Sequence, residues 1–213
     1  MNVSVLIGSC DAYSPLWPHF DVLFRRYWKL NTKNILVSET LAFDNDLYQT
    51  ALPGKLQWGE RMLLALNEIN TEYTVFLLED YFLTEPITQE FIDDHIRILE
   101  SYNAQKIMID INAGEPFYTL EHLQDDLYKF KLSSDHLNSI QPSVWKTDYL
   151  KQVLKPEYSP WQFEVDGNAF TQTLNPTIIL KARSKPVYFN FVRVGGRVSE
   201  GWEEVCRKEN LNL

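Results

Sequence analysis

Two carboxylates stand side by side at the end of the clearest buried strand that the sequence predicts. Residues 73–78 form a short apolar run that leads directly into Glu79 and Asp80. Buried carboxylates are costly unless they are paired or bound to a metal ion. Their oxygens can hold a divalent cation that a diphosphate also binds, or they can simply cap the turn after the strand. The first interpretation predicts an active site at this strand end.

Other polar side chains follow two further predicted strands. Ser9 and Asp11 come directly after the first apolar run of the chain, and Glu39 closes a second such run. In a mostly parallel sheet, ligands bind in the crevice at the carboxyl ends of the strands. We therefore expect these three side chains to lie near Glu79 and Asp80.

Helices separate these strands along the chain. The strands are predicted at residues 3–8, 34–38, 73–78 and 106–111. Ser14 before Pro15 is a helix-start pattern, a second helix begins at Trp58, and Thr88 is the cap of a third. Strands that alternate with helices form a mostly parallel sheet with helices on both faces. The sequence therefore predicts an α/β fold.

The second half of the chain is less regular. Predicted there are a strand at 127–132, a turn or short strand at 139–145, helices at 146–154 and about 161–174, and strands at 177–181 and 187–191. The polar stretch 40–57 in the first half is predicted to be a loop. The length of 213 residues suits one domain with a sizeable core.

Composition and charge narrow the class of protein. Hydrophobic residues make up 45% and charged residues 23%, which is ordinary for a folded globular protein. The formal net charge of −9 argues against a nucleic-acid partner, because such proteins neutralise phosphates with Lys and Arg. The apolar start of the chain is too short to span a bilayer and lacks the basic flank of a signal peptide. With only two cysteines, these features predict a cytoplasmic protein without a transmembrane segment.

Several well-known catalytic patterns are absent from the sequence. It contains no GxxxxGK[ST] loop, no GxGxxG after the first strand and no GxSxG elbow. P-loop NTPases, dinucleotide-binding folds and esterases are therefore disfavoured. The four histidines show no zinc-ligand spacing, and His136, in a loop-rich region, is the strongest functional candidate among them.

A basic stretch lies between Lys181 and Arg197 in an otherwise acidic chain, and it also carries Arg183, Lys185 and Arg193. Such a stretch can bind a phosphate group or an anionic surface. Lys and Arg also protect exposed sheet edges from pairing with other chains. The sequence favours neither explanation over the other.

Taken together, the first half of the chain resembles the nucleotide-binding half of GT-A glycosyltransferases. The resemblance rests on the polar turn after the first strand, the acidic residue that closes the second, and the segment WGERMLLALNEINTEYTVFLLEDYFL. In that family a short acidic motif of DxD type ends a buried strand. The corresponding residues here, Leu78 to Tyr81, depart from a strict DxD pattern.

The resemblance implies roles for the residues at the strand ends. Asp80 would hold a divalent cation, Mn or Mg, together with the diphosphate, and Glu79 would lie nearer the sugar. Arg61 would reach the donor from a helix, and Glu39 would contact the nucleobase or ribose. The turn 9–11 would line the nucleotide. The resemblance therefore implies a nucleotide-sugar donor, and UDP is the first nucleotide to test.

The second half resembles bacterial glycosyltransferases of surface-polysaccharide assembly, through the segments SIQPSVWKTDYL and SPWQFEVDGN. This resemblance implies one carboxylate base that takes a proton from the acceptor hydroxyl, as direct displacement requires. Glu164 occupies that place and Asp166 is its competitor, although Glu164 also fits an exposed helix carboxylate. Gln141, Trp145 and Trp161 would contact the sugar acceptor, and both tryptophans are equally compatible with packing.

The full prediction is one GT-A-like domain in which residues 1–112 bind the nucleotide-sugar and residues 113–213 bind the acceptor. We expect an inverting glycosyltransferase of bacterial polysaccharide biosynthesis that acts on a saccharide or lipid-linked acceptor. With a lipid-linked acceptor, the enzyme would act at the inner face of the membrane. Arg193 and Arg197 would cover the diphosphate as a lid, which two glycines allow to move. Two alternatives stay open: a non-catalytic sugar- or nucleotide-binding module with a decayed site, and a nucleotidyltransferase, whose Gly-rich loop after the first strand is missing.

Overall fold

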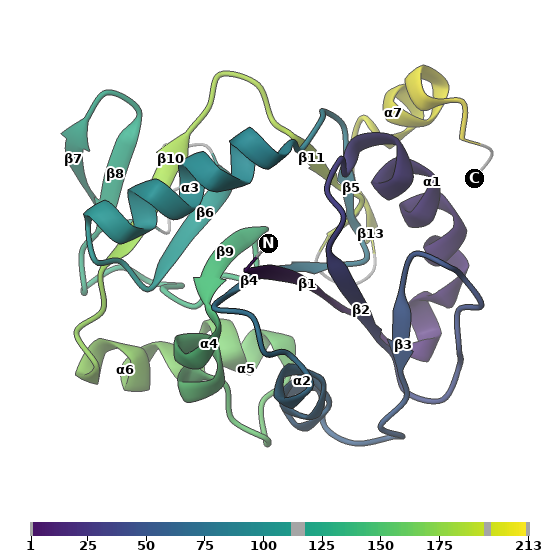
Figure 1. Cartoon of the computed structure of the whole chain (residues 1–213), viewed down its shortest axis with the longest axis horizontal. Helices are drawn as coiled ribbons and strands as arrows, with labels where there is room; N and C mark the ends of the chain where they lie inside the picture. Colours follow the sequence, from purple (N-terminus) through teal and green to yellow (C-terminus); the bar gives the residue numbers. More distant parts are fainter. Residues whose placement is uncertain (1, 112–117, 194–196, 212–213) are drawn as a thin grey trace.

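A computed structural model describes residues 2–111, 118–193 and 197–211, and within these ranges a nine-stranded sheet runs through the molecule (Figure 1). Its strands are β1 (Val3–Gly8), β2 (Lys33–Val37), β3 (Gln49–Ala51), β4 (Tyr73–Leu78), β6 (Lys106–Ile111), β7 (Leu120–Gln124), β8 (Leu127–Phe130), β9 (Ser143–Lys146) and β10 (Ile178–Ala182). Across the sheet the order is β3-β2-β1-β4-β9-β6-β10-β8-β7.

Seven of the nine strands of this sheet run in one direction, and only β8 and β9 run in the opposite one. β3, β2, β1 and β4 run in one direction, and β6 and β10 are parallel to each other. β9 lies antiparallel between β4 and β6, and β8 and β7 are antiparallel at the far edge. The predicted α/β fold with a mostly parallel sheet is confirmed. β9 comes from the second half of the chain but pairs with two strands of the first half, so both halves share one sheet.

Helices cover both faces of the sheet (Figure 1). They are η1, a 3-10 segment (Asp11–Leu16), α1 (Trp17–Tyr27), α2 (Trp58–Asn67), α3 (Gln89–Ser101), α4 (Thr147–Val153), α5 (Pro160–Glu164), α6 (Asp166–Thr173) and α7 (Trp202–Glu209). Alternate residues of β1 face the helix layers on the two sides of the sheet. Val5 and Ile7 pack in the core with α1 and α3, and Leu6 packs in the core with α2, α4 and α5.

Several element boundaries differ from the predicted ones. Ser14 and Pro15 lie inside the 3-10 segment, and α1 begins at Trp17 with Pro18 in its first turn, where a missing N–H costs nothing. The helix predicted at 161–174 is two helices that break at Val165. β3 lies within the predicted loop, and β7 pairs with β8 as a hairpin that was not predicted. The Thr88 cap is confirmed, since its side chain accepts a hydrogen bond from the Phe91 N–H at 3.2 Å.

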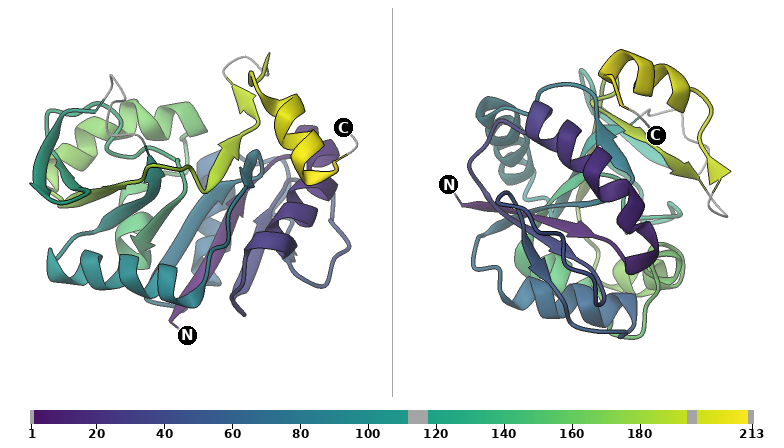
Figure 2. Two further views of the ribbon diagram at one scale, coloured as in Figure 1. Left: turned by 90° about the horizontal axis from the view of Figure 1, so that it is seen from above. Right: turned by 90° about the vertical axis from the view of Figure 1, so that its right-hand side faces the viewer.

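Two small ladders and the last helix complete the described chain. β5 (Tyr81–Leu83) pairs with β11 (Tyr188–Asn190), and β12 (Val192–Arg193) pairs with β13 (Arg197–Val198). Figure 2 shows α7, in yellow, beside α1, in purple. Glu209 of α7 is buried there and accepts hydrogen bonds from Arg26 and Tyr27. None of the helices in the described ranges is long and apolar enough to cross a membrane.

The register of the central strands places the predicted site residues at one edge of the sheet. Gly8 is opposite both Val37 and Leu78. The segments that follow these three residues therefore leave the sheet side by side, which brings Ser9, Glu39 and Glu79 into one region.

Candidate active site

A cavity of about 550 Å³ opens where β1 and β4 end, which is within the usual size of small-ligand sites, roughly 300–1,000 Å³. Five of the residues predicted for the donor line this cavity: Ser9, Glu39, Arg61, Glu79 and Asp80. Three of the residues predicted for the acceptor and the base also line it: Gln141, Trp161 and Glu164. The cavity thus brings together residues from both halves of the chain.

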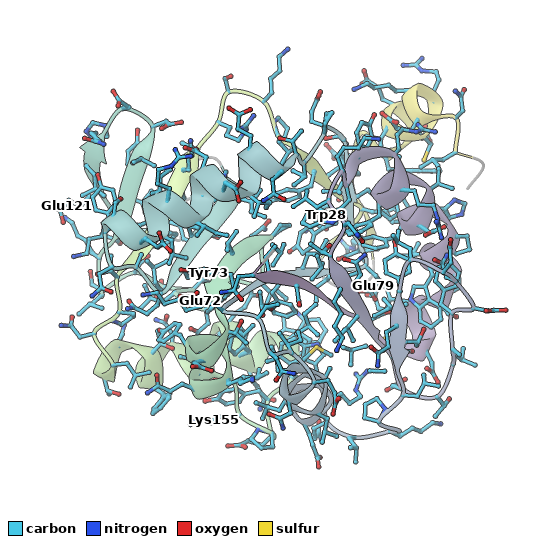
Figure 3. All side chains as sticks on the ribbon, viewed as in Figure 1. Trp28, Glu72, Tyr73, Glu79, Glu121 and Lys155 are labelled. Carbon is cyan, nitrogen blue, oxygen red and sulfur yellow. The ribbon has the colours of Figure 1, made fainter. Side chains whose placement is uncertain are left out.

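Glu79 is held in place by Ser9, which lines the same cavity. Its Oε1 accepts a hydrogen bond from the Ser9 hydroxyl at 3.0 Å, and that hydroxyl accepts one from the Trp17 indole N–H at 2.8 Å. The side chain is only 5% exposed and lies inside the molecule, whereas Glu121 on the edge strand β7 lies at its periphery (Figure 3). Burial, together with the charge of Asp80, raises the pKa of Glu79 well above its usual range.

Asp80 has one carboxylate oxygen, Oδ1, that is buried and has no hydrogen-bond partner among the described residues. Burial raises the pKa of this carboxyl to about 7. No cluster of three or more His, Cys, Asp or Glu side chains in the described ranges could hold a metal by itself. Two adjacent carboxylates with an unpartnered oxygen nevertheless fit a cation of the Mg²⁺ type, which takes its other ligands from substrate phosphates and water.

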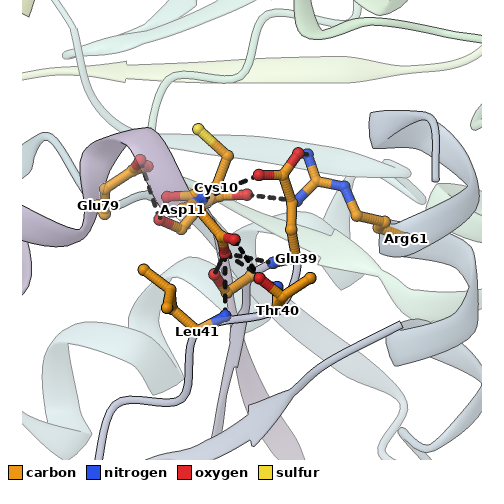
Figure 4. A network of polar contacts seen from close by, with 9 residues as sticks. Cys10, Asp11, Glu39, Thr40, Leu41, Arg61 and Glu79 are labelled. Carbon is orange, nitrogen blue, oxygen red and sulfur yellow. Dashed lines mark hydrogen bonds and ion pairs between the residues drawn. The ribbon is translucent and has the colours of Figure 1, made fainter. Parts of the chain in front are cut away.

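Arg61 reaches the cavity from the first turns of α2. Its guanidinium is 5% exposed, donates to the Ser9 carbonyl oxygen at 2.8 Å, and lies 3.9 Å from a Glu39 carboxylate oxygen (Figure 4). Its Nε has no hydrogen-bond partner in the described part of the chain. Arg61 lines the cavity, and a cationic side chain with hydrogen-bonding capacity still unused is suited to an anionic or carbonyl ligand group.

Asp11, in contrast, does not line the cavity, and its predicted contact with the donor stays a prediction. Its Oδ1 accepts hydrogen bonds from the Ser38 hydroxyl and from the N–H groups of residues 39–41, and its Oδ2 accepts from the Thr40 hydroxyl (Figure 4). The pKa of Asp11 is held well below its usual range, chiefly by the hydrogen bond from the Thr40 side chain. Asp11 therefore ties the loop after β2 to the loop after β1.

Glu164 is the last residue of α5 and lines the part of the cavity that the second half of the chain forms. It is half-buried, and its Oε1 accepts a hydrogen bond from the Ile140 N–H at 2.8 Å. Burial raises its pKa, while the Ile140 N–H and the charges of His136 and Lys106 act in the opposite direction. Asp166, its competitor for the role of base, is exposed at the start of α6 and does not line the cavity.

The three residues predicted for the acceptor have different surroundings. Trp161 is 63% exposed at the cavity rim, and Gln141 lines the cavity while accepting a hydrogen bond from the Tyr188 hydroxyl. Trp145 is 0% exposed, because β9 places it in the core between the sheet and Tyr149. Its predicted contact with a sugar is therefore wrong, and core packing is its role.

The predicted arginine lid lies partly outside the described residues, which exclude 194–196 and the side chain of Arg193. Arg197 is described and exposed in β13, and it does not line the cavity. Val192, at the start of β12, does line it. The lid stays a prediction.

Several cavity residues were not predicted for the site, namely Tyr13, Trp58, Tyr81, Tyr118 and Asn190. Cys10, from the predicted turn 9–11, and His136 line the cavity as well. The aromatic content of 14% was a signal of such a lining, but it did not say which aromatic residues would be involved. His136 has a left-handed backbone, with φ of 61°, a strained conformation that functional sites often contain.

No family model and no curated protein matches the chain, but solved structures with low sequence identity do. The S. aureus protein TarS is 16% identical with a TM-score of 0.57, covering 98% of this chain and 39% of TarS. The mannosyltransferase PcManGT from Pyrobaculum calidifontis, in complex with GDP-Man and Mn²⁺, is 10% identical with a TM-score of 0.56, covering 92% of this chain and 58% of that one. This chain thus spans about two fifths of the length of TarS.

A nucleotidyl-transferring enzyme is also similar. CMP:2-keto-3-deoxy-manno-octonic acid synthetase, in complex with CTP, is 10% identical with a TM-score of 0.54, covering 98% of this chain and 97% of that one. At these identities the likeness shows the fold alone. The predicted resemblance to GT-A glycosyltransferases is confirmed at that level, for a fold that nucleotidyltransferases share.

Proposed function

We propose that the chain is a glycosyltransferase that uses a nucleoside-diphosphate sugar as donor. The observation that carries this proposal is that one cavity contains the buried Glu79 beside the half-buried Asp80 and, from the other half of the chain, Glu164. A strand-end carboxylate pair suits a diphosphate with its cation, and a separate carboxylate suits a base. In support, TarS has been solved with UDP-GlcNAc and PcManGT with GDP-Man and Mn²⁺.

The donor would lie against the ends of β1, β2 and β4. Asp80, with its unpartnered oxygen, would hold a divalent cation, Mn or Mg, with Glu79 beside it. Such a cation supplies positive charge to the departing diphosphate. Arg61 and Glu39 would contact the nucleotide, because both side chains line the cavity and their charged groups lie 3.9 Å apart.

The acceptor would enter on the side of Trp161 and Gln141. Glu164 would take the proton of the acceptor hydroxyl while the hydroxyl oxygen forms a bond to the anomeric carbon. The bond from that carbon to the diphosphate breaks, and its electron pair leaves with the nucleoside diphosphate. One base and one displacement give inversion at the anomeric carbon. The acceptor class that we propose is a saccharide or lipid-linked sugar of bacterial polysaccharide biosynthesis, reached at the cytoplasmic face of the membrane.

The first test is thermal stabilisation by nucleoside diphosphates and nucleotide-sugars, with and without Mn²⁺. A ligand that binds the folded state adds about 2.7 kcal/mol of stability at one hundred times its Kd, and it thereby raises the melting temperature. We expect one nucleoside diphosphate to give a metal-dependent shift that Asp80→Asn abolishes. Asp126→Asn, in the exposed turn of the β7–β8 hairpin, is the matched control and should keep the shift.

The second test is turnover. Release of the nucleoside diphosphate from a nucleotide-sugar, with or without an acceptor, would support the proposal. Binding without any turnover would instead favour a non-catalytic sugar- or nucleotide-binding module with this fold.

A nucleotidyltransferase is the second candidate, because the synthetase that is similar to this chain matches it over nearly its whole length. Such an enzyme would bind a nucleoside triphosphate and release pyrophosphate. Incubating the chain with nucleoside triphosphates and candidate sugars, and measuring pyrophosphate, separates the two candidates. The Gly-rich loop after β1 that this class carries is missing from the sequence, which is why we rank it second.

A further inference from the structure

A lysine lies fully buried behind the acceptor wall of the cavity. Lys106 is the first residue of β6, and its side chain is 0% exposed. Taking an isolated ammonium group out of water is costly, so a buried lysine needs partners that compensate for the lost hydration. Nothing in the proposed donor or acceptor contacts uses this residue.

The partners of Lys106 suit a charged ammonium group. Its Nζ donates to the Ser139 carbonyl oxygen at 2.6 Å and to the Leu137 carbonyl oxygen at 3.3 Å, and it lies 4.4 Å from the centre of the Trp145 ring. Two carbonyl oxygens and a ring face all attract positive charge. An ammonium group offers three donors and no acceptor, which matches these three partners.

The loop that Lys106 holds is the loop that holds Glu164. Residues 137 and 139 accept its hydrogen bonds, and the next residue, Ile140, donates its N–H to Glu164 Oε1 at 2.8 Å. The electrostatic interaction between Lys106 and Glu164 stabilises the charged form of each. Lys106 thus acts on Glu164 both through the loop and through its charge.

We propose that Lys106 is a positioning residue for the candidate base: it fixes the segment 137–140 and, from behind the cavity wall, keeps Glu164 ionised so that it can accept the acceptor proton. This inference rests on the proposed function for its purpose. The physical coupling that it asserts between the two side chains does not depend on that function.

The electrostatic balance at Glu164 supports this role. Burial raises the pKa of Glu164, and Lys106, His136 and the Ile140 N–H oppose that rise. Tyr81, from β5, also faces this carboxyl and would be a neutral neighbour. Burial lowers the pKa of Lys106 to about 7, and Glu164 acts to raise it. Without the lysine, desolvation would favour the protonated and therefore inactive form of the base.

The test is a direct titration of Glu164 by carbon NMR in protein labelled at glutamate carboxyls, with Glu164→Gln used to assign the signal. In Lys106→Met, which keeps an unbranched side chain of similar length, we expect the pKa of Glu164 to rise by about one pH unit or more. Lys146→Met is the matched control, since Lys146 lies on β9 and its Nζ lies 3.4 Å from Asn103 in an exposed contact. It should leave the titration unchanged.

An unchanged pKa of Glu164 in folded Lys106→Met would overturn the inference. If that variant does not fold, the reciprocal measurement decides: the pKa of Lys106 in Glu164→Gln should fall below its value in the unsubstituted protein, and an unchanged value overturns the coupling. Neither measurement needs a substrate, so failure of glycosyl transfer and failure of this inference are distinguishable.

Discussion

At the residue scale, burial separates two tryptophans that look equivalent in the sequence. Trp145→Ala should destabilise the protein by about 3–5 kcal/mol, because a fully buried ring leaves a cavity. Trp161→Ala should change stability by no more than about 0.5 kcal/mol, since the ring is 63% exposed. Urea unfolding of both variants measures the two effects.

Trp161→Ala has a second expected result in the enzyme assay. The acceptor KM should rise several-fold, while the melting-temperature shift with the nucleoside diphosphate stays unchanged, because Trp161 lies on the side of the cavity that we propose for the acceptor. If the acceptor KM is unchanged, Trp161 has no part in acceptor binding.

Glu164→Gln keeps the size of the side chain and removes its ability to take a proton. We expect kcat to fall by about 10²–10⁴-fold, which is the usual contribution of a positioned base, with binding of the donor nucleotide unaffected. Initial rates at saturating donor and acceptor measure the effect. Glu157→Gln, an exposed residue just before α5, is the control, and a similar loss in it would refute the assignment of the base.

Single residues were predictable from the sequence where the local pattern decides their place. Glu79 and Asp80 follow a long apolar strand, so their position at a sheet edge could be read directly. Asp11 also follows a strand, but its carboxylate turns toward the loop after β2, where the backbone N–H groups of residues 39–41 lie close by. A linear sequence does not reveal which neighbouring loop offers these donors.

At the element scale, α2 begins in close contact with the segment before α5. The N–H groups of Gly59 and Glu60 donate to the Tyr158 and Pro156 carbonyl oxygens at 2.8 and 3.0 Å. A Cβ on Gly59 would lie 2.0 Å from the Lys155 carbonyl oxygen, where backbone would have to move. This contact joins the helix that carries Arg61 to the segment that leads into the helix of Glu164.

Gly59→Ala should therefore destabilise the protein, although alanine is the better helix former. We expect a loss of about 1–3 kcal/mol, the usual range for overpacking, together with weaker nucleotide binding through Arg61. Chemical unfolding and the nucleotide melting shift check the two effects. Gln57→Ala, exposed just before the same helix, should change neither, and a stable Gly59→Ala would show that the two segments can separate without cost.

The element that sequence patterns described least well is β9. Its four residues are too few to show a strand period: residues 143–145 were predicted only as part of a turn or short strand, and Lys146 as the start of a helix. In the structure β9 occupies the middle of the sheet between β4 and β6. Its place is set by long-range pairing, and this pairing also decides that Trp145 is buried and that the loop before β9 reaches Glu164.

At the scale of the whole molecule, the shared sheet predicts one cooperative unfolding unit. β9 and β10 of the second half pair with β4 and β6 of the first, so residues 1–112 have no complete sheet of their own. We expect that a fragment of residues 1–112 does not fold alone and that the full chain unfolds in one transition. Circular dichroism and fluorescence during urea unfolding should give coincident curves, and two separated transitions would contradict a single unit.

The stability of the whole molecule should also depend on pH through one buried histidine. His95 of α3 is 0% exposed, its Nδ1 lies 2.7 Å from the Phe91 carbonyl oxygen, and its ring stacks on Phe91. Burial lowers its pKa to about 4, with Lys181 acting in the same direction and Asp94 in the other. The folded protein therefore keeps His95 neutral at a pH where the unfolded chain already binds a proton.

Because the unfolded state binds more protons between pH 6.5 and about 4, the stabilisation from neutral His95 is complete above that window and is lost as the pH falls through it. The loss should approach about 3 kcal/mol at the lower end, since each tenfold change in proton affinity corresponds to about 1.4 kcal/mol. Urea unfolding at several pH values should give a shallower decline for His95→Leu than for the unsubstituted protein. His122→Leu, on the exposed strand β7, is the control, and its free energy of unfolding should fall with pH as steeply as that of the unsubstituted protein. Identical slopes in all three proteins would mean that His95 is protonated in the folded state as readily as in the unfolded chain.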